Sequence, residues 1–275
     1  MFTKPVAEMT LITEPYPHVA VADAVTVHEG LVADFPEESR FGRKIRMHGD
    51  LTAGDEEYER LIAQSNAYKS MHDWAYSEGF VKSFLEMFDE EIDVRVNSGE
   101  LFLDPRSLPI RPEPYEGRKM VGMSSVKTQN PFLFPRLDLG IGKLNYGLEN
   151  GGGGIHVDNL TRLVSILVYI DDNETMVGGE HRLYRLDKMT PVIDKIYPAK
   201  ANFMVASLQS NMAFHDVNPV TAISGFRKAM YLAVSCSTVI WRPHKDRSLQ
   251  KLTKNRYRPS KAERVIKRVK SAVGI

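Results

Sequence analysis

The pattern of apolar and polar positions divides the chain into a helical part and an extended part. Between Asp55 and Ile92, apolar side chains recur at helical spacing, with a helix-start signal at Gly54 and Asp55 and a break at Ser65 and Asn66. This stretch predicts one or two packed helices. Their predicted buried face consists of five side chains, Trp74, Phe80, Phe84, Leu85 and Phe88.

The segment before these helices predicts a short strand and a short helix. Residues 10–25, TLITEPYPHVAVADAV, alternate apolar residues with proline and polar residues, which is typical of a strand entering the fold. A helix is expected from about Val25 to Phe35. It ends before Pro36, because proline disfavours the helical conformation of the residue that precedes it.

From about Asp93 the chain changes to short extended runs, the first of them in IDVRVNSGELFLD, punctuated by Pro, Gly and Asn. The proline-rich segment from Ser107 to Tyr115 is interpreted as a surface loop or lid. The later strand candidates are LDLGIGKLNYG, LTRLVSILVYI, GGEHRLYRL, ANFMVASLQ, HDVNPV and FRKAMYLAVSCSTVIW. Several short strands without intervening helices favour an antiparallel sandwich or barrel. The predicted fold class is therefore α+β, with helices first and a β-sandwich after them.

Length and composition exclude several classes of protein. A chain of 275 residues buries about three quarters of the surface that it exposes when unfolded, so its stability requires neither disulfides nor a structural metal. The single cysteine, Cys236, has no partner within the chain, and no charged and then apolar leader opens the sequence, so a reducing, cytoplasmic location is expected. No apolar run approaches the roughly 20 residues that span a bilayer, and no membrane partner is expected.

The net charge of +1 conceals a strongly basic C-terminal segment. From Arg242 to Lys270, twelve Lys and Arg residues accompany two acidic residues, which gives +10 and leaves −9 for the rest of the chain. Such a tail can bind nucleic acid, a membrane surface or an acidic partner, although a solvated terminal helix is the commonest explanation. We interpret residues 242–275 as an accessory tail.

Candidate chemistry begins at a run of four glycines. In GGGGIHVDN, from Gly151 to Asn159, the glycines precede His156 and Asp158, which stand two residues apart at the start of a predicted strand. Flexible glycines mark a hairpin tip or a close approach of the backbone. Because alternate residues of a strand share a face, both side chains point the same way and supply half of a metal site.

His215 is the candidate for the third ligand. It stands in MAFHDVNPV, where an apolar strand changes to a proline-containing turn, far enough from His156 for several strands to return the chain to the same end of a sandwich. His156, Asp158 and His215 would then form a 2-His-1-carboxylate facial triad, which binds non-haem iron(II) and leaves positions open for substrate and oxygen. A His-x-Asp pair alone is common by chance, so this hypothesis depends on further residues.

Arg227 and two tyrosines provide such support. Arg227 begins the strand FRKAMYLAVS, and a guanidinium inside a sandwich needs a carboxylate, which a dicarboxylic cosubstrate would supply. Tyr146 precedes the glycine run, and Tyr169 lies on the strand that follows it. The residues that share the face of Arg227 are Ala229, Tyr231 and Ala233. These small residues and one ring leave room for a bound acid.

Five motifs therefore follow one another between Leu137 and Trp241: NYGLENGGGGIHVDN, a strand ending in Tyr169, VGGEHRLYRL, HDVNPV and Arg227. Their order resembles that of the iron(II)- and 2-oxoglutarate-dependent dioxygenases, in the branch similar to prolyl 4-hydroxylases. The resemblance implies a double-stranded β-helix, or jelly-roll, core with N-terminal packing helices and a basic C-terminal helical tail. Residues 1–275 would form a single oxygenase domain, with a strand and support helices in 1–92, the catalytic core in 93–241 and the tail in 242–275.

The resemblance also implies roles for single residues. The two histidines and the aspartate named above would bind iron, and Arg227 would bind the distal carboxylate of 2-oxoglutarate. Tyr169 falls where the family often places a hydrogen-bond partner of that carboxylate, and Tyr146 falls where a tyrosine often contacts the cosubstrate near the metal. The spacing from His215 to Arg227 is a little longer than is usual in this branch, which implies a turn insertion and makes Lys228 the second candidate for the carboxylate anchor.

The implied reaction uses Fe(II), O2 and 2-oxoglutarate as cosubstrate, with ascorbate as a possible assay additive. The cosubstrate is decarboxylated to succinate and CO2, and a hydroxyl group is delivered to an unactivated C–H bond. Asp158 occupies the ligand position that a halide would need, so halogenation is not expected, whereas desaturation, epoxidation and ring formation stay open.

Other functions stay open from the sequence. The expected substrate is a small molecule such as an amino acid, a sugar or a natural-product intermediate; a peptidyl, prolyl-type substrate is the first alternative, and the basic tail leaves nucleic acid open. A cupin-like metalloenzyme would use the same three ligands with zinc or manganese for non-redox chemistry and would not need Arg227. A non-catalytic binding module would keep the sandwich and need no metal ligands.

Overall fold

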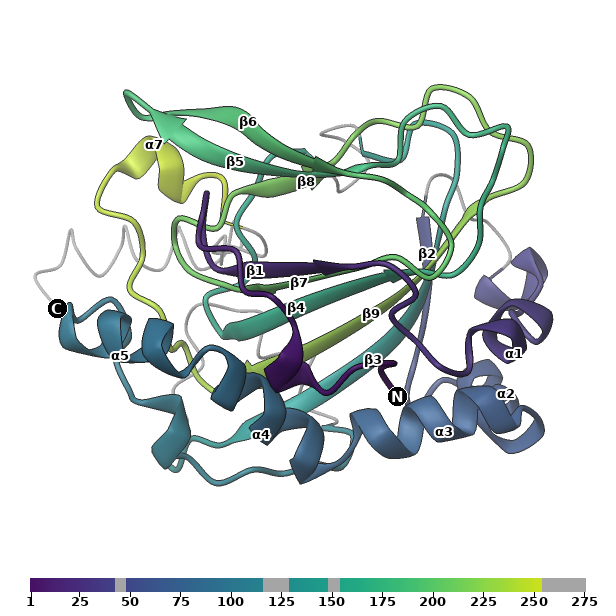
Figure 1. Cartoon of the computed structure of the whole chain (residues 1–275), viewed down its shortest axis with the longest axis horizontal. Helices are drawn as coiled ribbons and strands as arrows, with labels where there is room; N and C mark the ends of the chain where they lie inside the picture. Colours follow the sequence, from purple (N-terminus) through teal and green to yellow (C-terminus); the bar gives the residue numbers. More distant parts are fainter. Residues whose placement is uncertain (43–47, 116–128, 148–153, 254–275) are drawn as a thin grey trace, which may run out of the picture.

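Two antiparallel sheets face each other in the computed structural model, which describes residues 1–42, 48–115, 129–147 and 154–253. The larger sheet contains, in spatial order, β1 (His18–Val21), β7 (Met204–Leu208), β4 (Arg162–Tyr169), β9 (Arg227–Cys236), β3 (Leu133–Gly142) and β2 (His48–Thr52). The smaller sheet contains β6 (Thr190–Tyr197), β5 (His181–Asp187) and β8 (His215–Val217). Figure 1 shows the smaller sheet above the larger one. This mixed, sheet-rich architecture with antiparallel strands confirms the predicted sandwich and is consistent with a jelly roll.

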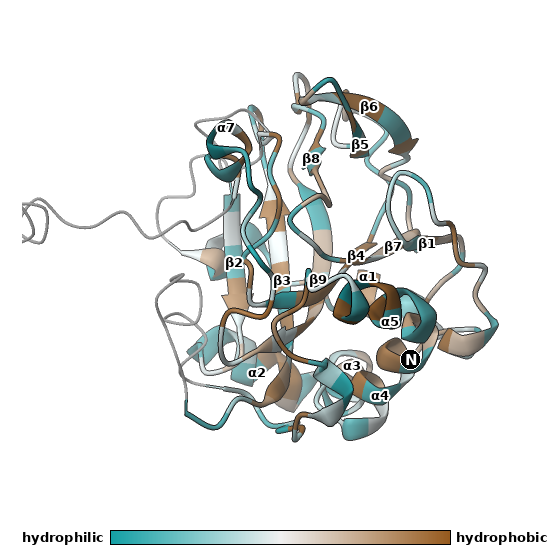
Figure 2. Ribbon diagram, turned by 90° about the vertical axis from the view of Figure 1, so that its left-hand side faces the viewer, coloured by the Kyte–Doolittle hydropathy of each residue, from teal (hydrophilic) through white to brown (hydrophobic). Residues whose placement is uncertain are grey.

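Helices from the N-terminal part of the chain lie on the side of the larger sheet that faces away from the smaller sheet (Figures 1 and 2). They are α1 (His28–Ala33), α2 (Glu56–Gln64), α3 (Asn66–Ala75), α4 (Glu78–Met87) and α5 (Asp89–Asn97). The 3-10 helices are η1 (Val6–Glu8), η2 (Glu38–Phe41) and η3 (Pro105–Ser107), and α7 (Arg247–Gln250) follows the last strand. None of the helices in the described ranges is long and apolar enough to cross a membrane.

Serine side chains divide the long helical stretch into more helices than the sequence predicts. One or two helices are expected over residues 55–92, and the structure has four, α2 to α5. Ser65 Oγ accepts a hydrogen bond from Tyr68 N at 3.3 Å, and Ser77 Oγ accepts one from Phe80 N at 3.1 Å. Each serine therefore caps the N-terminus of a new helix.

The extended run predicted from Asp93 is wrong in its first part, because α5 continues to Asn97. Three acidic residues stand in the first turn of α5, where the partial positive charge of a helix N-terminus stabilises them. The Arg95 guanidinium also forms an i,i+4 ion pair with Glu91 at 2.6 Å. These interactions favour the helix despite the β-branched residues of the segment.

The two faces of the larger sheet differ in polarity. In β3, Leu137, Leu139 and Ile141 are buried in the main apolar core between the sheet and the helices. Arg136 and Asp138 alternate with them along the strand and therefore lie on the opposite face, toward the smaller sheet. Charged side chains of the larger sheet therefore point into the interior between the two sheets, where they can bind a ligand.

The predicted helical face is part of the apolar core. Four of its members are buried and the fifth, Trp74, is partly buried against the core; the four are Phe80, Phe84, Leu85 and Phe88. Burial of these aromatic rings fixes the helices on the sheet and leaves the interior between the sheets for other side chains.

The first part of the predicted accessory tail belongs to the folded core. Val157 N donates a hydrogen bond to Leu252 O at 3.0 Å, and Leu249 and Leu252 pack with Val157 and Phe214. Apolar burial beside the strand of the candidate ligands holds this segment in place, which corrects the boundary at residue 242. The rest of the predicted helical tail, residues 254–275, and the glycines at 151–153 lie outside the described residues.

The proline-rich segment is tied to the larger sheet. Arg111 N donates to Leu133 O at 2.8 Å, and Leu133 N donates to Pro109 O at 2.9 Å. The ring of Tyr115 packs against that of Phe132, with centroids 5.1 Å apart. The segment predicted as a surface loop or lid thus extends the edge of β3.

Candidate metal centre

A short antiparallel bridge brings together the two histidines that the sequence proposes as metal ligands. His156 N donates to His215 O at 3.0 Å, and His215 N donates to His156 O at 2.9 Å. The centroids of the two rings are 4.5 Å apart. Asp158 stands two residues after His156, so its carboxylate comes to the same place.

The three side chains present ligand atoms to a common point. One nitrogen of each histidine and one carboxylate oxygen of Asp158 all lie within 4.8 Å of one another, close enough to hold a metal ion. Asp158 Oδ1 lies 3.9 Å from His156 Nε2 and 4.0 Å from His215 Nε2. The structure therefore brings all three predicted ligands together, although His215 is far from His156 and Asp158 in the sequence.

Backbone carbonyls orient both rings. His156 Nδ1 lies 2.6 Å from Gly154 O, and His215 Nδ1 lies 2.9 Å from Ala213 O. A carbonyl only accepts, so each Nδ1 carries the proton, and the Nε2 lone pair points toward Asp158. Histidines that bind metals are typically held in this way through the ring nitrogen that does not bind.

Polar neighbours also position the Asp158 carboxylate. The Ser165 hydroxyl donates to Asp158 Oδ2, while Oδ1 faces the two histidines. Arg162 Nη1 lies 3.9 Å from Asp158 Oδ2 and 3.5 Å from Ser165 Oγ. Burial lowers the pKa of the Arg162 guanidinium, because a charge that leaves water is disfavoured. Neither Ser165 nor Arg162 was proposed from the sequence; their place on the inner face of β4, three residues apart across a bulge, is not visible in its pattern.

Arg227 is buried without a carboxylate partner. Its side chain lies on the inner face of β9 and the residue is 2% exposed. Nη1 donates to the Tyr231 hydroxyl at 3.0 Å, whereas Nε and Nη2 have no hydrogen-bond partner within the described part of the chain. A buried guanidinium with unused donors is costly, so this arrangement suits an anionic ligand.

Tyrosine rings surround this guanidinium. The Arg227 Cζ atom lies 4.5 Å from the ring centroid of Tyr169 and 5.4 Å from that of Tyr146. The Tyr169 hydroxyl donates to Gly179 O at 2.9 Å, and the Tyr146 hydroxyl lies 3.2 Å from that of Tyr231. Burial raises the pKa of Tyr146 and Tyr169, so both stay neutral. The direct partner of Arg227 is Tyr231, for which the sequence suggested only a place on the same face.

Glycines leave room for these rings. A Cβ atom at Gly140 would stand 2.4 Å from Tyr231 Cε2, and one at Gly142 would stand 2.9 Å from Tyr146 Cδ1. Larger residues at either position of β3 would displace the rings that line the Arg227 site.

Lys228 points away from this interior, as its place next to Arg227 on a regular strand requires. Its Nζ atom pairs with Asp171 Oδ2 at 2.7 Å and lies above the rings of Phe35 and Phe226. The second candidate for the carboxylate anchor is therefore on the opposite face of β9.

Sequence reasoning missed His181, the first residue of β5. Its ring centroid is 5.5 Å from that of His215, and the residue is 8% exposed. In the sequence it follows the glycines of VGGEHRLYRL, where only a hairpin was expected. The alternation of apolar residues in HRLYRL was the available signal, since it places His181 on the inner face of the strand.

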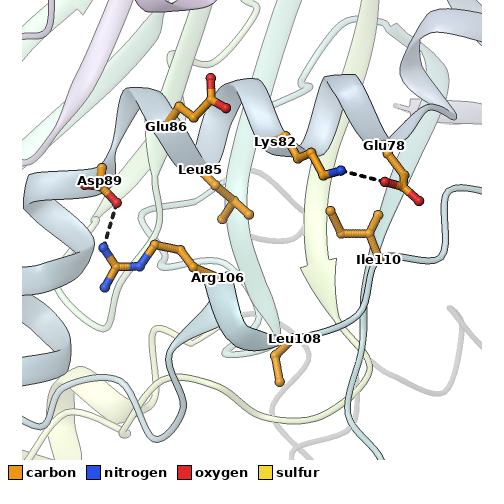
Figure 3. Close-up of a pocket in the computed structure, with 8 residues that line it drawn as sticks. All are labelled: Glu78, Lys82, Leu85, Glu86, Asp89, Arg106, Leu108 and Ile110. Carbon is orange, nitrogen blue, oxygen red and sulfur yellow. Dashed lines mark hydrogen bonds and ion pairs between the residues drawn. The ribbon is translucent and has the colours of Figure 1, made fainter.

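A separate pocket of about 580 Å³ lies on the helical side of the molecule (Figure 3). Its lining comes from α4, the first residue of α5, η3 and the segment after η3: Glu78, Lys82, Leu85, Glu86, Asp89, Arg106, Leu108 and Ile110. Figure 3 shows that Lys82 pairs with Glu78 and that Arg106 pairs with Asp89. These two pairs leave Glu86 as an additional acidic side chain of the lining, and the residues of the metal centre are not part of this pocket.

The comparisons with known proteins relate the chain to solved structures. No family model and no curated protein matches the sequence. Similar solved structures include a prolyl 4-hydroxylase of Phytophthora capsici, at 16% identity over 79% of this chain and 58% of that one, with a TM-score of 0.44. A Pseudomonas putida prolyl 4-hydroxylase has 13% identity over 81% of this chain and 94% of its own, with a TM-score of 0.43. SnoN, a non-haem α-ketoglutarate-dependent epimerase from nogalamycin biosynthesis, has 10% identity over 89% and 86%, with a TM-score of 0.43.

The chain thus spans less than two thirds of the first of these proteins and most of the other two. Because the identities are low and the TM-scores lie below 0.5, the reaction is inferred from the side chains of the site.

Proposed function

We propose that the protein is a non-haem iron(II)- and 2-oxoglutarate-dependent dioxygenase that hydroxylates an unactivated C–H bond of a small molecule. The observation that carries this proposal is Arg227, a buried guanidinium with two donor nitrogens that lack partners in the described part of the chain. It faces the same interior as a His-Asp-His group that could hold a metal ion. A dicarboxylic cosubstrate matches both features, since one end can bind a metal and the other can pair with the guanidinium.

Each protein group would have a defined task in this reaction. His156 Nε2, Asp158 Oδ1 and His215 Nε2 would hold iron(II) from one side, with the orientation that their carbonyl and hydroxyl partners impose. Bound iron would supply the chemistry that couples O2 to the decarboxylation of 2-oxoglutarate. Arg227 and Tyr231 would bind the distal carboxylate and thereby fix the cosubstrate in one pose.

The tyrosines would keep this end of the interior dry. Tyr146 and Tyr169 flank the Arg227 guanidinium and are 9% and 1% exposed. Exclusion of water strengthens the attraction between the guanidinium and a carboxylate, because the effective dielectric constant is lower. We propose this role for both residues in place of the direct contact with the cosubstrate that the sequence predicted.

The cupin-like alternative explains less of the site. A zinc or manganese enzyme with non-redox chemistry would use the same three ligands but would leave the Arg227 guanidinium buried without a counter-charge. A non-catalytic module would require neither the ligand group nor its orienting hydrogen bonds. We therefore rank both below the dioxygenase.

A small substrate with an anionic group suits the interior beyond the metal centre. Arg136 forms an ion pair with Asp138 there, and Arg162 lies between Asp158 and Arg136 with no carboxylate closer than 3.9 Å among the described residues. Once a metal engages Asp158, the Arg162 guanidinium is left to pair with a substrate carboxylate or phosphate. A peptidyl substrate is the alternative, and it would have to present such a group.

Succinate formation tests the proposed function. The purified protein, with iron(II), ascorbate and 2-oxoglutarate under air, is expected to form succinate, and omission of iron is expected to abolish it. A library of small acids then identifies compounds that stimulate turnover. Because some enzymes of this type turn over slowly without their substrate, binding of 2-oxoglutarate to the manganese(II)-loaded protein is measured in parallel. Absence of both succinate and binding would favour the cupin-like alternative.

A further inference from the structure

The pairing of β5 with β8 directs His181 into the interior that contains the metal centre. His181 is opposite Val217, which lies two residues after His215 on the same face of β8. The intervening residues, Arg182 and Asp216, form an ion pair at 2.6 Å on the other face. His181 therefore shares its face with His215.

His181 also lies on the side of the metal centre where Arg227 is found. Gly179, two residues before it, accepts a hydrogen bond from the Tyr169 hydroxyl, and a Cβ atom on this glycine would stand 3.6 Å from Arg227 Cδ. The His181 ring is in turn 5.5 Å from the His215 ring, measured between centroids. His181 thus lies beside His215, and the chain two residues before it approaches Arg227 at Gly179.

One nitrogen of the buried His181 ring lacks a hydrogen-bond partner among the described residues. The residue is 8% exposed, and its Nδ1 atom has no partner in the portion of the chain that the structure describes. His18, in contrast, is fully buried and has both ring nitrogens within 2.7 Å of an oxygen atom, Tyr16 O and the Tyr197 hydroxyl. A buried polar atom without a partner costs free energy, so an orphaned nitrogen beside the candidate metal ligands suits a ligand that completes it.

A fourth metal ligand is not the best role for this ring. The mutually close ligand atoms come from His156, Asp158 and His215, and His181 is not a member of that group. A fourth protein ligand would also occupy a position that a cosubstrate and oxygen need. The Nδ1 atom of His181 and the Nε and Nη2 atoms of Arg227 instead form two sets of unused polar atoms beside one interior.

We propose that His181 is a further cosubstrate-positioning residue, whose ring N–H donates a hydrogen bond to a carboxylate oxygen of the 2-oxo dicarboxylic acid. This inference rests on the proposed function and adds a residue to it. An imidazole ring carries at least one N–H donor whether it is neutral or protonated, so the orphaned Nδ1 can serve as the donor. His181 and Arg227 would hold the same ligand from the smaller and the larger sheet.

Isothermal titration of 2-oxoglutarate into the manganese(II)-loaded full chain tests this role without turnover. His181→Gln keeps an N–H donor, and His181→Met has a similar length without one. We expect His181→Met to weaken 2-oxoglutarate binding about tenfold or more, as a hydrogen bond to a charged group predicts, and His181→Gln to weaken it less than threefold. Manganese affinity should stay within twofold for both, because His181 is not a ligand. His72→Met, on α3 and away from the interior, is the control for loss of a partly buried histidine.

The outcomes separate this inference from the proposed function. If the unmodified protein does not bind 2-oxoglutarate, the proposed function fails and the inference fails with it. If the unmodified protein binds and His181→Met binds equally well, the proposed function stands and the role of His181 is overturned. Thermal unfolding of each metal-loaded variant verifies that it is folded, and a His181→Met protein that does not fold is replaced by His181→Leu in the same comparison with His181→Gln.

Discussion

At the scale of single residues, hydrogen bonds divide each candidate ligand into one atom that is held and one that faces the metal. In Asp158, the Ser165 hydroxyl holds Oδ2, and Oδ1 faces the histidines. The Ser165 side chain need not touch a metal to determine how well the carboxylate binds one. The same division in His156 and His215 depends on backbone carbonyls, which mutation cannot remove.

Ser165→Ala is therefore expected to lower metal affinity about 10- to 100-fold, because the carboxylate loses its orienting donor. Asp158→Ala is expected to abolish metal-dependent turnover without unfolding the protein. Manganese(II) titration followed calorimetrically checks both, with circular dichroism as the test of folding. Ser83→Ala is the matched control, since the Ser83 hydroxyl bonds only Phe80 O within α4 among the described residues. Equal metal affinity in Ser165→Ala and the parent protein would show that this hydrogen bond does not position the ligand.

The unused donors of Arg227 predict opposite effects on binding and stability. Arg227→Met removes a buried charge that has no counter-charge among the described residues, so the free energy of unfolding should rise by about 1–2 kcal/mol. Binding of 2-oxoglutarate should fall at least 100-fold, because the carboxylate loses a two-pronged partner. Urea unfolding and calorimetric titration measure the two effects.

Lys228→Met is the control for this variant. Lys228 lies on the outer face of β9 with Asp171, so its loss should leave 2-oxoglutarate binding unchanged. A loss of binding in Lys228→Met but not in Arg227→Met would mean that the register of β9 is shifted by one residue.

At the scale of secondary-structure elements, the C-terminal segment has a different role from the one its charge suggests. Asp246 caps α7 by accepting a hydrogen bond from Ser248 N at 2.7 Å. The helix then presents Leu249 to an apolar cluster that includes Val157, the residue between the two ligands of the His-x-Asp pair. A short, basic segment thereby supports the metal centre through apolar packing.

Truncation distinguishes the two parts of this segment. A chain that ends at Thr253 should keep its metal affinity, whereas a chain that ends at Arg242 should lose about 2–4 kcal/mol of stability and much of its metal affinity, because it lacks two leucines and the bond from Val157 N to Leu252 O. Thermal unfolding and manganese titration of the two truncated proteins give the comparison. If the shorter protein has full metal affinity, residues 242–275 do not support the metal centre and are an accessory tail.

The local pattern of apolar and polar residues predicted which helices and strands form better than it predicted where they begin and end. Alternation identified the strands that carry His215 and Arg227 and correctly separated Arg227 from Lys228, whereas His156 and Asp158 lie before the strand that they were expected to begin. It indicated the break at Ser65, where α3 begins, but not that Ser77 would start a further helix, because a serine within an amphipathic stretch can equally stay inside it. The extended prediction for residues 93–97 failed because the charges of α5 outweighed its β-branched residues.

Only those residues of the candidate site whose side-chain type suggests metal binding could be predicted from the sequence. Two histidines and an aspartate at strand ends suggest a metal without any knowledge of the fold, and the structure places them together. His181, Ser165 and Arg162 are ordinary residues of strands until the register of β5 with β8 and the bulge in β4 are known. Pairing between distant strands determines these contacts, and the alternation in HRLYRL indicates only the face on which His181 lies.

At the scale of the whole molecule, the site joins the two sheets. His215 and His181 come from the smaller sheet, Arg227 and Ser165 from the larger one, and Asp158 from the loop that leads into β4. A ligand that contacts both sheets binds the folded state alone, and it should stabilise the fold as a unit. The free energy of unfolding of the ligand-free protein therefore reports most directly how much the buried polar groups destabilise the fold.

Buried histidines predict that the ligand-free protein loses stability in mild acid. Burial lowers the pKa of His18 and of His72 below the ordinary value of 6.5, so the folded state binds fewer protons than the unfolded state as the pH falls below about 7. Stability should therefore be full near neutral pH and should decrease as the pH falls from about 7 toward 5. A loss of about 1 kcal/mol lowers the Tm of a chain of this size by roughly 2–4 °C. Thermal unfolding in the presence of a chelator measures this slope. His18→Gln, which cannot gain a proton, should flatten it, and a Tm that rises on acidification would contradict the assignment of these histidines as neutral.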